Sequence, residues 1–294
     1  MVSADESIRW ELRQRLIAIE ARVTWAGRLT TGDLRRAFGI SRSQASKDLA
    51  RYQELCPWNL RYDRHEKCYR ARDDFRPRFL HGTAREFLRA LHFTGEGGAS
   101  PLTSIAADIT SVEVLEPPQR EFDVITLQRV NTAVRESRAL VVEYISMNTA
   151  APRELELSPH ALVFTGSRWH VRAHSTYHHD FRDFLLSRMR PVPELGGAAA
   201  RGVDQDHDWQ TMVNVRIGAH PGLSPAQQAI IEHDFGMVSG VLERRMRLAL
   251  VPYYLQLMRV GKGDTERDPA SQQIVLLNAT ELGRYDRLSR GSYS

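Results

Sequence analysis

Four short segments of alternating character follow one another between residues 139 and 189. In chain order they are "ALVVEYIS" (139–146), "LELSPHALVF" (155–164), "RWHVRAHS" (168–175) and "FRDFLLSRM" (181–189). Each segment is alternating or rich in β-forming residues, and turn residues bound it, which is typical of consecutive antiparallel strands. A helix that ends near residue 137 precedes them. We therefore expect a small, strongly bent antiparallel sheet or an open barrel in the middle of the chain.

Three breaks in composition divide the 294 residues into parts. They are rich in Gly, Ala or Pro and read "TGEGGASP" (94–101), "LEPPQ" (115–119) and "PELGGAAARG" (193–202). Such stretches are typical of linkers, and the chain is long enough for two or three domains with cores of their own. We expect four parts: an N-terminal domain (1–80), a helical linker (81–121), a central domain (122–195) and a C-terminal extension (205–294).

The first 75 residues predict three helices followed by a β-hairpin. Apolar residues recur at helical spacing from Ile8 to Val23, and Thr30 or Thr31 caps a second, short helix. Gly39 allows a tight turn, after which Ser41, with Gln44 three residues later, opens a third helix over 41–52. Two alternating segments, 59–63 and 67–71, then form the hairpin. This order is the winged helix-turn-helix plan, which places the third helix in the major groove of DNA and the hairpin on the flanking backbone.

The outer face of the 41–52 helix carries the candidate DNA-binding residues. Core positions take Ala45, Leu49 and Tyr52, and no acidic residue occurs from 41 to 47. Arg42 suits guanine and Gln44 suits adenine, unless Gln44 is occupied as the capping-box partner. The full set comprises Arg42, Ser43, Gln44, Ser46, Lys47 and Arg51 on the helix, with Arg61, Arg64 and Lys67, beside His65, in the hairpin.

The distribution of charge supports this interpretation. The first 80 residues hold 17 Lys and Arg against 11 Asp and Glu, whereas the remaining 214 hold 23 against 25. A local positive surplus favours a polyanion through counterion release. The alternative is an ordinary solvated helix face, but the surplus coincides with the acid-free face, and we expect binding to double-stranded DNA.

A second basic group is expected on the central sheet. In the 168–175 segment His170, Arg172 and His174 alternate with apolar residues, and further polar side chains occupy the neighbouring strands: Tyr144, Ser146, His160, Arg182 and Arg188. Guanidinium groups bind phosphate oxygens bidentately, so a cluster without its own carboxylate suits a phosphate-bearing ligand. The alternative, which the spacing leaves open, is that the arginines pair with Glu143, Glu154, Glu156 or Asp183, and that His170 and His174 are solvated.

The segments "VEYIS", "SPHALVF", "RWHVRAH" and "FRDFLLSRM" together resemble the WYL domain. The Trp-Tyr-Leu triplet of that family reads Trp169-His170-Val171 here, so only the tryptophan is kept. The resemblance implies an Sm-like β-barrel behind a winged helix, with a basic pocket that senses nucleotides or nucleic acid. The matching pocket positions are Tyr144, Ser146, His160, Arg182 and Arg188, and Arg172 lies on the WYL strand itself.

The C-terminal part predicts a strand–helix–strand–helix–strand order, at 209–217, 225–235, 240–247, 248–259 and 272–278, as in a small α+β sandwich. The fold class is thus multidomain α+β. The layout over nearly the whole chain is similar to that of the WYL repressors encoded beside BREX and CBASS phage-defence systems. That similarity implies a homodimer, held by the C-terminal extension, on an inverted-repeat operator. It also implies release of the operator when a small anionic or nucleotide-like effector binds.

Other functions are less consistent with the sequence. "HHD" (178–180) and "DQDHD" (204–208) are interpreted as polar loops rather than metal ligands, and no nucleophile or phosphate-cradling motif occurs. We expect no catalytic residue, metal or cofactor. RNA or single-strand binding by the barrel stays an alternative. Cys56 and Cys68 are interpreted as packing residues. No apolar run is long enough for a membrane span and the first residues lack a signal-peptide pattern, so we expect a cytoplasmic protein.

Overall fold

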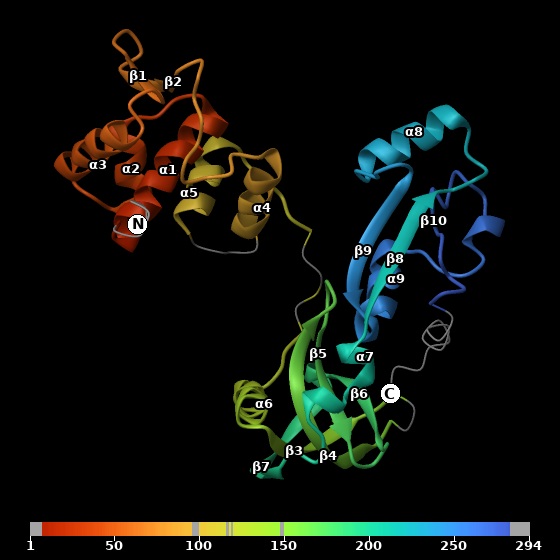
Figure 1. The fold of residues 1–294 in the computed structure, drawn as a ribbon. Coiled ribbons are helices and arrows are strands. Elements are labelled where there is room, and N and C mark those ends of the chain that lie inside the picture. The colour runs from red at the N-terminus through yellow and green to blue at the C-terminus, as the bar shows by residue number, and fades with distance from the viewer. Residues whose placement is uncertain (1–7, 96–99, 116–117, 119, 148–149, 283–294) are drawn as a thin grey trace. The chain divides into compact units, whose positions relative to one another are not determined.

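The computed structural model describes residues 8–95, 100–115, 118, 120–147 and 150–282. The chain divides into two compact units, Met1–Pro117 and Pro118–Ser294, which we describe separately. In Figure 1 the first unit runs from red to yellow and the second from green to blue. The expected breaks at 94–101 and 115–119 lie partly outside the described residues, at 96–99, 116–117 and 119.

The first unit contains the predicted three helices and hairpin. Its elements are α1 (Trp10–Ala26), α2 (Thr31–Phe38), α3 (Arg42–Leu55), β1 (Leu60–Asp63), β2 (Cys68–Ala71), α4 (Ala84–Gly95) and α5 (Pro101–Ile109). β1 and β2 pair antiparallel, and Leu29 exchanges backbone hydrogen bonds of 2.7 and 2.8 Å with Tyr69 of β2. The segment between α1 and α2 is thereby attached to the wing.

Local capping explains why α2 and α3 begin where they do. The Thr30 hydroxyl accepts a hydrogen bond from the Asp33 amide (3.3 Å), and the Asp33 carboxylate accepts one from the Thr30 amide (2.6 Å). This reciprocal capping box satisfies two otherwise unpaired donors. Gly39 ends α2 in the left-handed region at φ +64°, where a side chain is strained. The Ser41 hydroxyl then caps α3 by accepting from the Gln44 amide at 3.1 Å.

The residues expected as a helical linker pack against the winged helix. α4 and α5 both lie within the expected helical linker (81–121). Ile105 of α5 is buried in the same core as Leu16 and Leu49, and Asp108 ion-pairs with Arg22 of α1 at 2.7 Å. The described part of 81–117 therefore completes the first unit.

The second unit opens with α6 (Val124–Glu136) and a five-stranded antiparallel sheet. The strands are β3 (Arg138–Ile145), β4 (Pro152–Phe164), β5 (Trp169–Ser175), β6 (Asp180–Leu185) and β7 (Met189–Ala198), in the spatial order β6-β5-β4-β3-β7. Val130 and Ala133 of α6 pack on the sheet face that carries Val142 and Val171. The described pairings leave β6 and β7 at opposite edges, so the sheet is open, and the Sm-like barrel that the resemblance implies is not confirmed.

Two expectations about the end of this sheet are wrong. The 181–189 segment is not one strand, because a 3₁₀ turn at Leu186–Arg188 separates β6 from β7. The stretch from 193 is not a linker at its start, because β7 runs to Ala198 and pairs with β3. One of the glycines that suggested a linker, Gly196, instead permits close packing. A Cβ at Gly196 would lie 2.8 Å from that of Ala139, so only glycine fits.

The C-terminal part contains the predicted alternation of strands and helices. After a short 3₁₀ turn (Val203–Gln205) come α7 (His207–Gln210), β8 (Met212–Ala219), α8 (Pro225–Asp234), β9 (Val241–Arg247), a 3₁₀ turn (Leu248–Leu250), α9 (Val251–Met258) and β10 (Ile274–Leu276), with another 3₁₀ turn at Asp264–Glu266. The three strands form one antiparallel sheet in the order β10-β8-β9. Val215 and Ile217 of β8 are fully buried in its core with Val251 of α9.

Candidate functional site

The outer face of α3 presents most of its predicted DNA-binding side chains to solvent. Arg42, Ser43, Ser46 and Lys47 are exposed, as is Arg51 one turn later. Their opposite face is anchored by Ala45, Leu49 and Tyr52, all at most 1% exposed. Arg51 forms an ion pair of 2.8 Å with Glu54, an exposed contact of small energy that leaves its guanidinium available. The sequence pattern thus located the exposed face of this helix correctly.

Gln44 differs from its neighbours because its side chain is held in place. Its Nε2 donates to Asp48 Oδ1 at 2.9 Å, while Arg15 of α1 donates to Asp48 Oδ2 at 2.7 Å. The expected return bond of a capping box is therefore absent for Gln44, whose amide points along α3 instead. Asp48 is almost fully buried, and this relay fixes the orientation of Gln44 from the helix behind.

The wing presents Arg61, Arg64 and Lys67, which are all exposed. Its turn is shaped by Asp63, whose carboxylate accepts hydrogen bonds from the backbone amides of His65 and Glu66 at 3.0 and 3.1 Å. The bond from Glu66 is the main reason that the pKa of Asp63 lies below its usual value. Exposed Trp58 and Tyr62 flank the same hairpin, and the sequence reasoning did not single them out.

A buried carboxylate fixes the chain that leaves the wing. Glu20 of α1 is fully buried and accepts four hydrogen bonds, from the Tyr52 hydroxyl (2.9 Å) and from the backbone amides of Arg78 (2.7 Å), Phe79 (2.7 Å) and Leu80 (2.9 Å). Burial raises the pKa of Glu20, and these bonds oppose that shift. The contact joins α1, α3 and the segment after β2 in one place. It was not foreseen, because nothing in the sequence relates residue 20 to residue 78.

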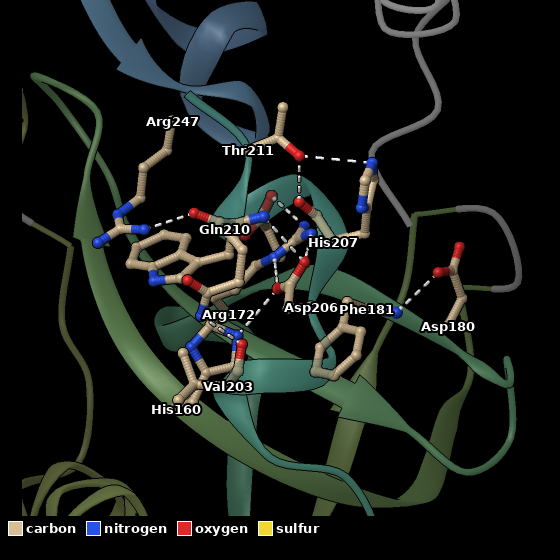
Figure 2. Close-up of polar contacts among 12 residues, drawn as sticks. His160, Arg172, Asp180, Phe181, Val203, Asp206, His207, Gln210, Thr211 and Arg247 are labelled. Carbon is tan, nitrogen blue, oxygen red and sulfur yellow. Dashed lines mark hydrogen bonds and ion pairs between the residues drawn. The ribbon is translucent and has the colours of Figure 1, made fainter. Parts of the chain in front are cut away.

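On the central sheet, Arg172 is neutralised by carboxylates of the chain itself. Its Nε and Nη2 donate to the two oxygens of Asp206 at 2.8 and 2.9 Å (Figure 2). Its Nη1 donates to Asp183 at 3.3 Å. Arg172 is 6% exposed and Asp206 only 1%. Pairing of an arginine with Asp183 was the open alternative in the sequence. Asp206 was interpreted as part of a polar loop, which is wrong.

His160 belongs to the same ion-pair cluster. Its Nε2 lies 2.9 Å from Asp206 Oδ2, and its ring makes edge contacts with Phe181 and Trp209, with centroids 5.7 and 5.2 Å away. Asp206 also caps α7 by accepting the Trp209 amide at 3.1 Å. Burial raises the pKa of Asp206, but the bonds from His160 and Arg172 outweigh it and hold that pKa well below the usual range. Asp206 therefore stays ionised.

Asp183 and Tyr253 extend this cluster to α9. The Tyr253 hydroxyl donates to Asp183 Oδ2 at 3.0 Å, and its ring lies against that of His170, with centroids 5.0 Å apart. Burial raises the pKa of Asp183, although Arg172 and Tyr253 oppose the change. The basic face of β5 is thus not a solvated surface, because it contacts the segment around Asp206 and α9.

The structure does not gather all six predicted ligand-binding residues into one cluster. Tyr144 packs edge-on against Phe184, with centroids 5.3 Å apart, in the core beneath α6. Arg182 shares the Phe184 side of β6, since residues two apart face the same way. Arg172 and His160 lie on the other face, with Asp183. Ser146 is half-buried just beyond β3.

Arg188 lies between these two groups. Its guanidinium stands beside the Tyr144 hydroxyl, where it opposes the effect of burial, which raises the pKa of Tyr144. The same hydroxyl accepts the Leu185 amide at 3.3 Å. Leu185 pairs across the strands with His170, and the positive charge of Arg188 is near enough to lower the pKa of His170.

Comparison with known proteins assigns the chain to a family. It is 34% identical over 288 residues to the DNA-binding transcriptional repressor CapW of Stenotrophomonas maltophilia, covering 98% of this chain and 96% of that protein. The chain belongs to the CapW family. The CapW proteins of Pseudomonas aeruginosa and Escherichia coli strain KTE188 are 34% and 32% identical over 277 residues, which is 94% of this chain and 92% of each relative.

Three family models match consecutive parts of this CapW-family chain. They are the BrxR transcriptional regulator winged helix-turn-helix domain (residues 11–93), the WYL domain (125–193) and the BrxR C-terminal dimerization domain (212–282). The resemblance to WYL regulators is thereby confirmed. Asp206 and Trp209 lie between the last two matches, so the ion-pair cluster joins the WYL sheet to residues outside it.

Within the described residues, no group of three or more His, Cys, Asp or Glu side chains is arranged to hold a metal ion. His178 of the "HHD" turn instead contacts the Ser175 hydroxyl at 3.0 Å. Cys56 and Cys68 are free thiols, and Cys68 is buried. None of the helices in the described part of the chain is long and apolar enough to cross a membrane.

Proposed function

We propose that this chain is a sequence-specific, DNA-binding transcriptional repressor that acts as a homodimer. The observation that carries the proposal is the exposed, acid-free face of α3, held on a rigid winged-helix core. The relatives named as DNA-binding transcriptional repressors and the C-terminal dimerization match support it. A two-fold dimer presents two copies of α3, which suits an inverted repeat with half-sites about one helical turn (roughly 34–36 Å), or a multiple of it, apart.

Within this function the residues of α3 and the wing divide by chemistry. Arg42 at the start of α3 reads a guanine, and Gln44, oriented by Asp48, reads a neighbouring base through its remaining amide groups. Lys47 and Arg51 hold phosphates, while Arg61, Arg64 and Lys67 of the wing hold the flanking backbone. Ser43 and Ser46 complete the contact surface on the same exposed face.

The regulated genes and the signal form the second part of the proposal. The family resemblance favours a phage-defence operon as the target and a phosphate-bearing, nucleotide-like effector bound by the WYL domain. Tyr144, Ser146, Arg182 and Arg188 are the candidates for effector contact, whereas His160 and Arg172 hold Asp206. An effector releases the operator only if it binds the DNA-free state more tightly than the DNA-bound state.

The test is binding to an inverted-repeat duplex from upstream of the gene, measured by fluorescence anisotropy over a range of salt concentrations. We expect Lys47→Ala to weaken binding to all duplexes alike and to reduce the salt slope by about one unit. Arg42→Ala should cost about 1–3 kcal/mol at one base position only. Arg89→Ala, which removes an exposed charge from α4, is the matched control. Salt-resistant preference for single-stranded RNA over the duplex would overturn the repressor proposal in favour of an RNA-binding module.

A further inference from the structure

His170 occupies an unusual position for a polar side chain. It is 2% exposed within β5, and neither Nδ1 nor Nε2 has a hydrogen-bond partner among the described residues. Buried polar groups are nearly always paired, because an unpaired one loses its bonds to water without replacement. Two unpaired nitrogens on one buried ring therefore need a polar partner that the described residues do not supply.

The charges around His170 show what kind of partner fits. Burial is the main reason that its pKa falls to about 4, and Arg168, Arg120 and Arg188 add to the shift as nearby positive charges. These come from the β4–β5 turn, the segment before α6 and the 3₁₀ turn after β6, while α9 contributes the Tyr253 ring. None of these four neighbours carries a negative charge.

Arg188 also has a buried atom without a partner, although its guanidinium contacts the Tyr144 hydroxyl. Its Nη1 atom is buried and has no hydrogen-bond partner among the described residues. Arg172, only two residues from His170 on the same face of β5, is by contrast saturated by Asp206 and Asp183. On this face of β5 Arg172 is thus neutralised by carboxylates, whereas His170 has no such partner among the described residues. The two residues therefore do not serve the same structural role.

We propose that His170 and Arg188 form the phosphate-binding part of the effector site, with Arg120 and Arg168 supplying further positive charge. This proposal rests on the effector function proposed above and names its ligand-binding group. A phosphate oxygen would accept from Arg188 Nη1 and from a ring nitrogen of His170. The negative charge favours the imidazolium, so His170 takes up one proton from solvent as the anion binds.

The position of Tyr253 gives such binding a route to the dimerization region. Its ring lies against His170, and its hydroxyl donates to Asp183, which in turn contacts Arg172. A change of charge at His170 therefore alters the contact with Tyr253 of α9, and α9 lies within the matched dimerization domain. The contact between His170 and Tyr253 can therefore connect effector binding to the C-terminal domain directly.

The experiment uses the full chain with inorganic phosphate and AMP as probes, measured by calorimetry and by NMR of the imidazole resonances. His170→Phe keeps the ring against Tyr253 but removes both nitrogens, and Arg188→Gln removes the charge. We expect saturable binding of AMP and a shift of the His170 resonances toward imidazolium. Each substitution should weaken binding about 10- to 100-fold, the value of one charge-assisted hydrogen bond. His174→Phe, on the same face of β5, is the matched control and should change nothing.

The outcomes separate the site from the function. Binding that His170→Phe and Arg188→Gln leave unaltered, or the absence of saturable binding for both probes, would overturn the site. If AMP shifts the His170 resonances but does not release the operator, the site stands and the effector function fails. If AMP releases the operator from the wild type and from His170→Phe equally, the function stands and the site is wrong.

Discussion

The buried pairing of Arg172 with Asp206 makes a prediction whose size follows from the geometry. Asp206→Asn removes the charge that two Arg172 nitrogens contact at 2.8 and 2.9 Å, and it places an amide nitrogen where one donor now points. Breaking a buried ion pair on one side costs about 3–5 kcal/mol. Asp183 remains 3.3 Å from Arg172 as a partial counter-charge, so we expect the lower end, about 3 kcal/mol.

Hydrogen exchange of the folded chain measures this loss locally. About 3 kcal/mol corresponds to roughly 100-fold faster exchange of the amides of β5 and β6 through opening of the second unit. The amides of α3, in the first unit, should not change and serve as the internal control. In a double-mutant cycle, the losses from Asp206→Asn and Arg172→Leu should be strongly non-additive, because both substitutions remove the same ion pair. Acceleration below about fivefold, or additive single effects, would show that the cluster does not hold the sheet to the segment around Asp206.

Three further predictions concern stability. Glu20→Gln replaces an acceptor of four hydrogen bonds by a group with a donor of its own, and thermal unfolding should show a loss of about 3 kcal/mol. Gly196→Ala should cost about 1–3 kcal/mol in urea denaturation because of the clash in β7, whereas Gly197→Ala, with no atom within 4 Å of its Cβ, should cost much less. Because the folded pKa of Asp206 is depressed, its stabilisation is present above the unfolded pKa of about 3.9 and is lost only as the pH falls through the lower folded value. Acid titration followed by circular dichroism should show the wild type keeping this stabilisation at pH 4 and Asp206→Asn lacking it.

The winged helix was predictable from the sequence because its signals are local. Thr30 and Ser41 cap their helices within three residues, and Gly39 ends α2 through its own backbone conformation. The same holds for the exposed face of α3, since helical periodicity fixes which residues lie opposite Leu49. Each of these contacts spans a few residues, and the pattern of apolar and capping residues encodes it directly.

The candidate effector region was predicted less well because its contacts span long stretches of chain. Arg172 and Asp206 are 34 residues apart, and nothing near Asp206 distinguishes a buried counter-ion from a solvated loop residue. Gly196 indicated a linker for a similar reason. A glycine that permits close packing and a glycine that permits flexibility look the same until the partner strand is known.

The two basic residues on one face of β5, His170 and Arg172, differ in how they can respond to an anionic ligand. A cationic side chain with two carboxylate partners has little to gain from a further anion, so Arg172 acts as a fixed attachment for the segment around Asp206. His170 and Arg188 hold unpaired polar atoms and gain the full value of a new bond. Anion binding at one end of the strand therefore changes the charge against Tyr253 while the other end keeps the sheet attached. The Arg172–Asp206 contact would thus keep the sheet attached to the C-terminal part, while the His170–Tyr253 contact would change when the anion binds.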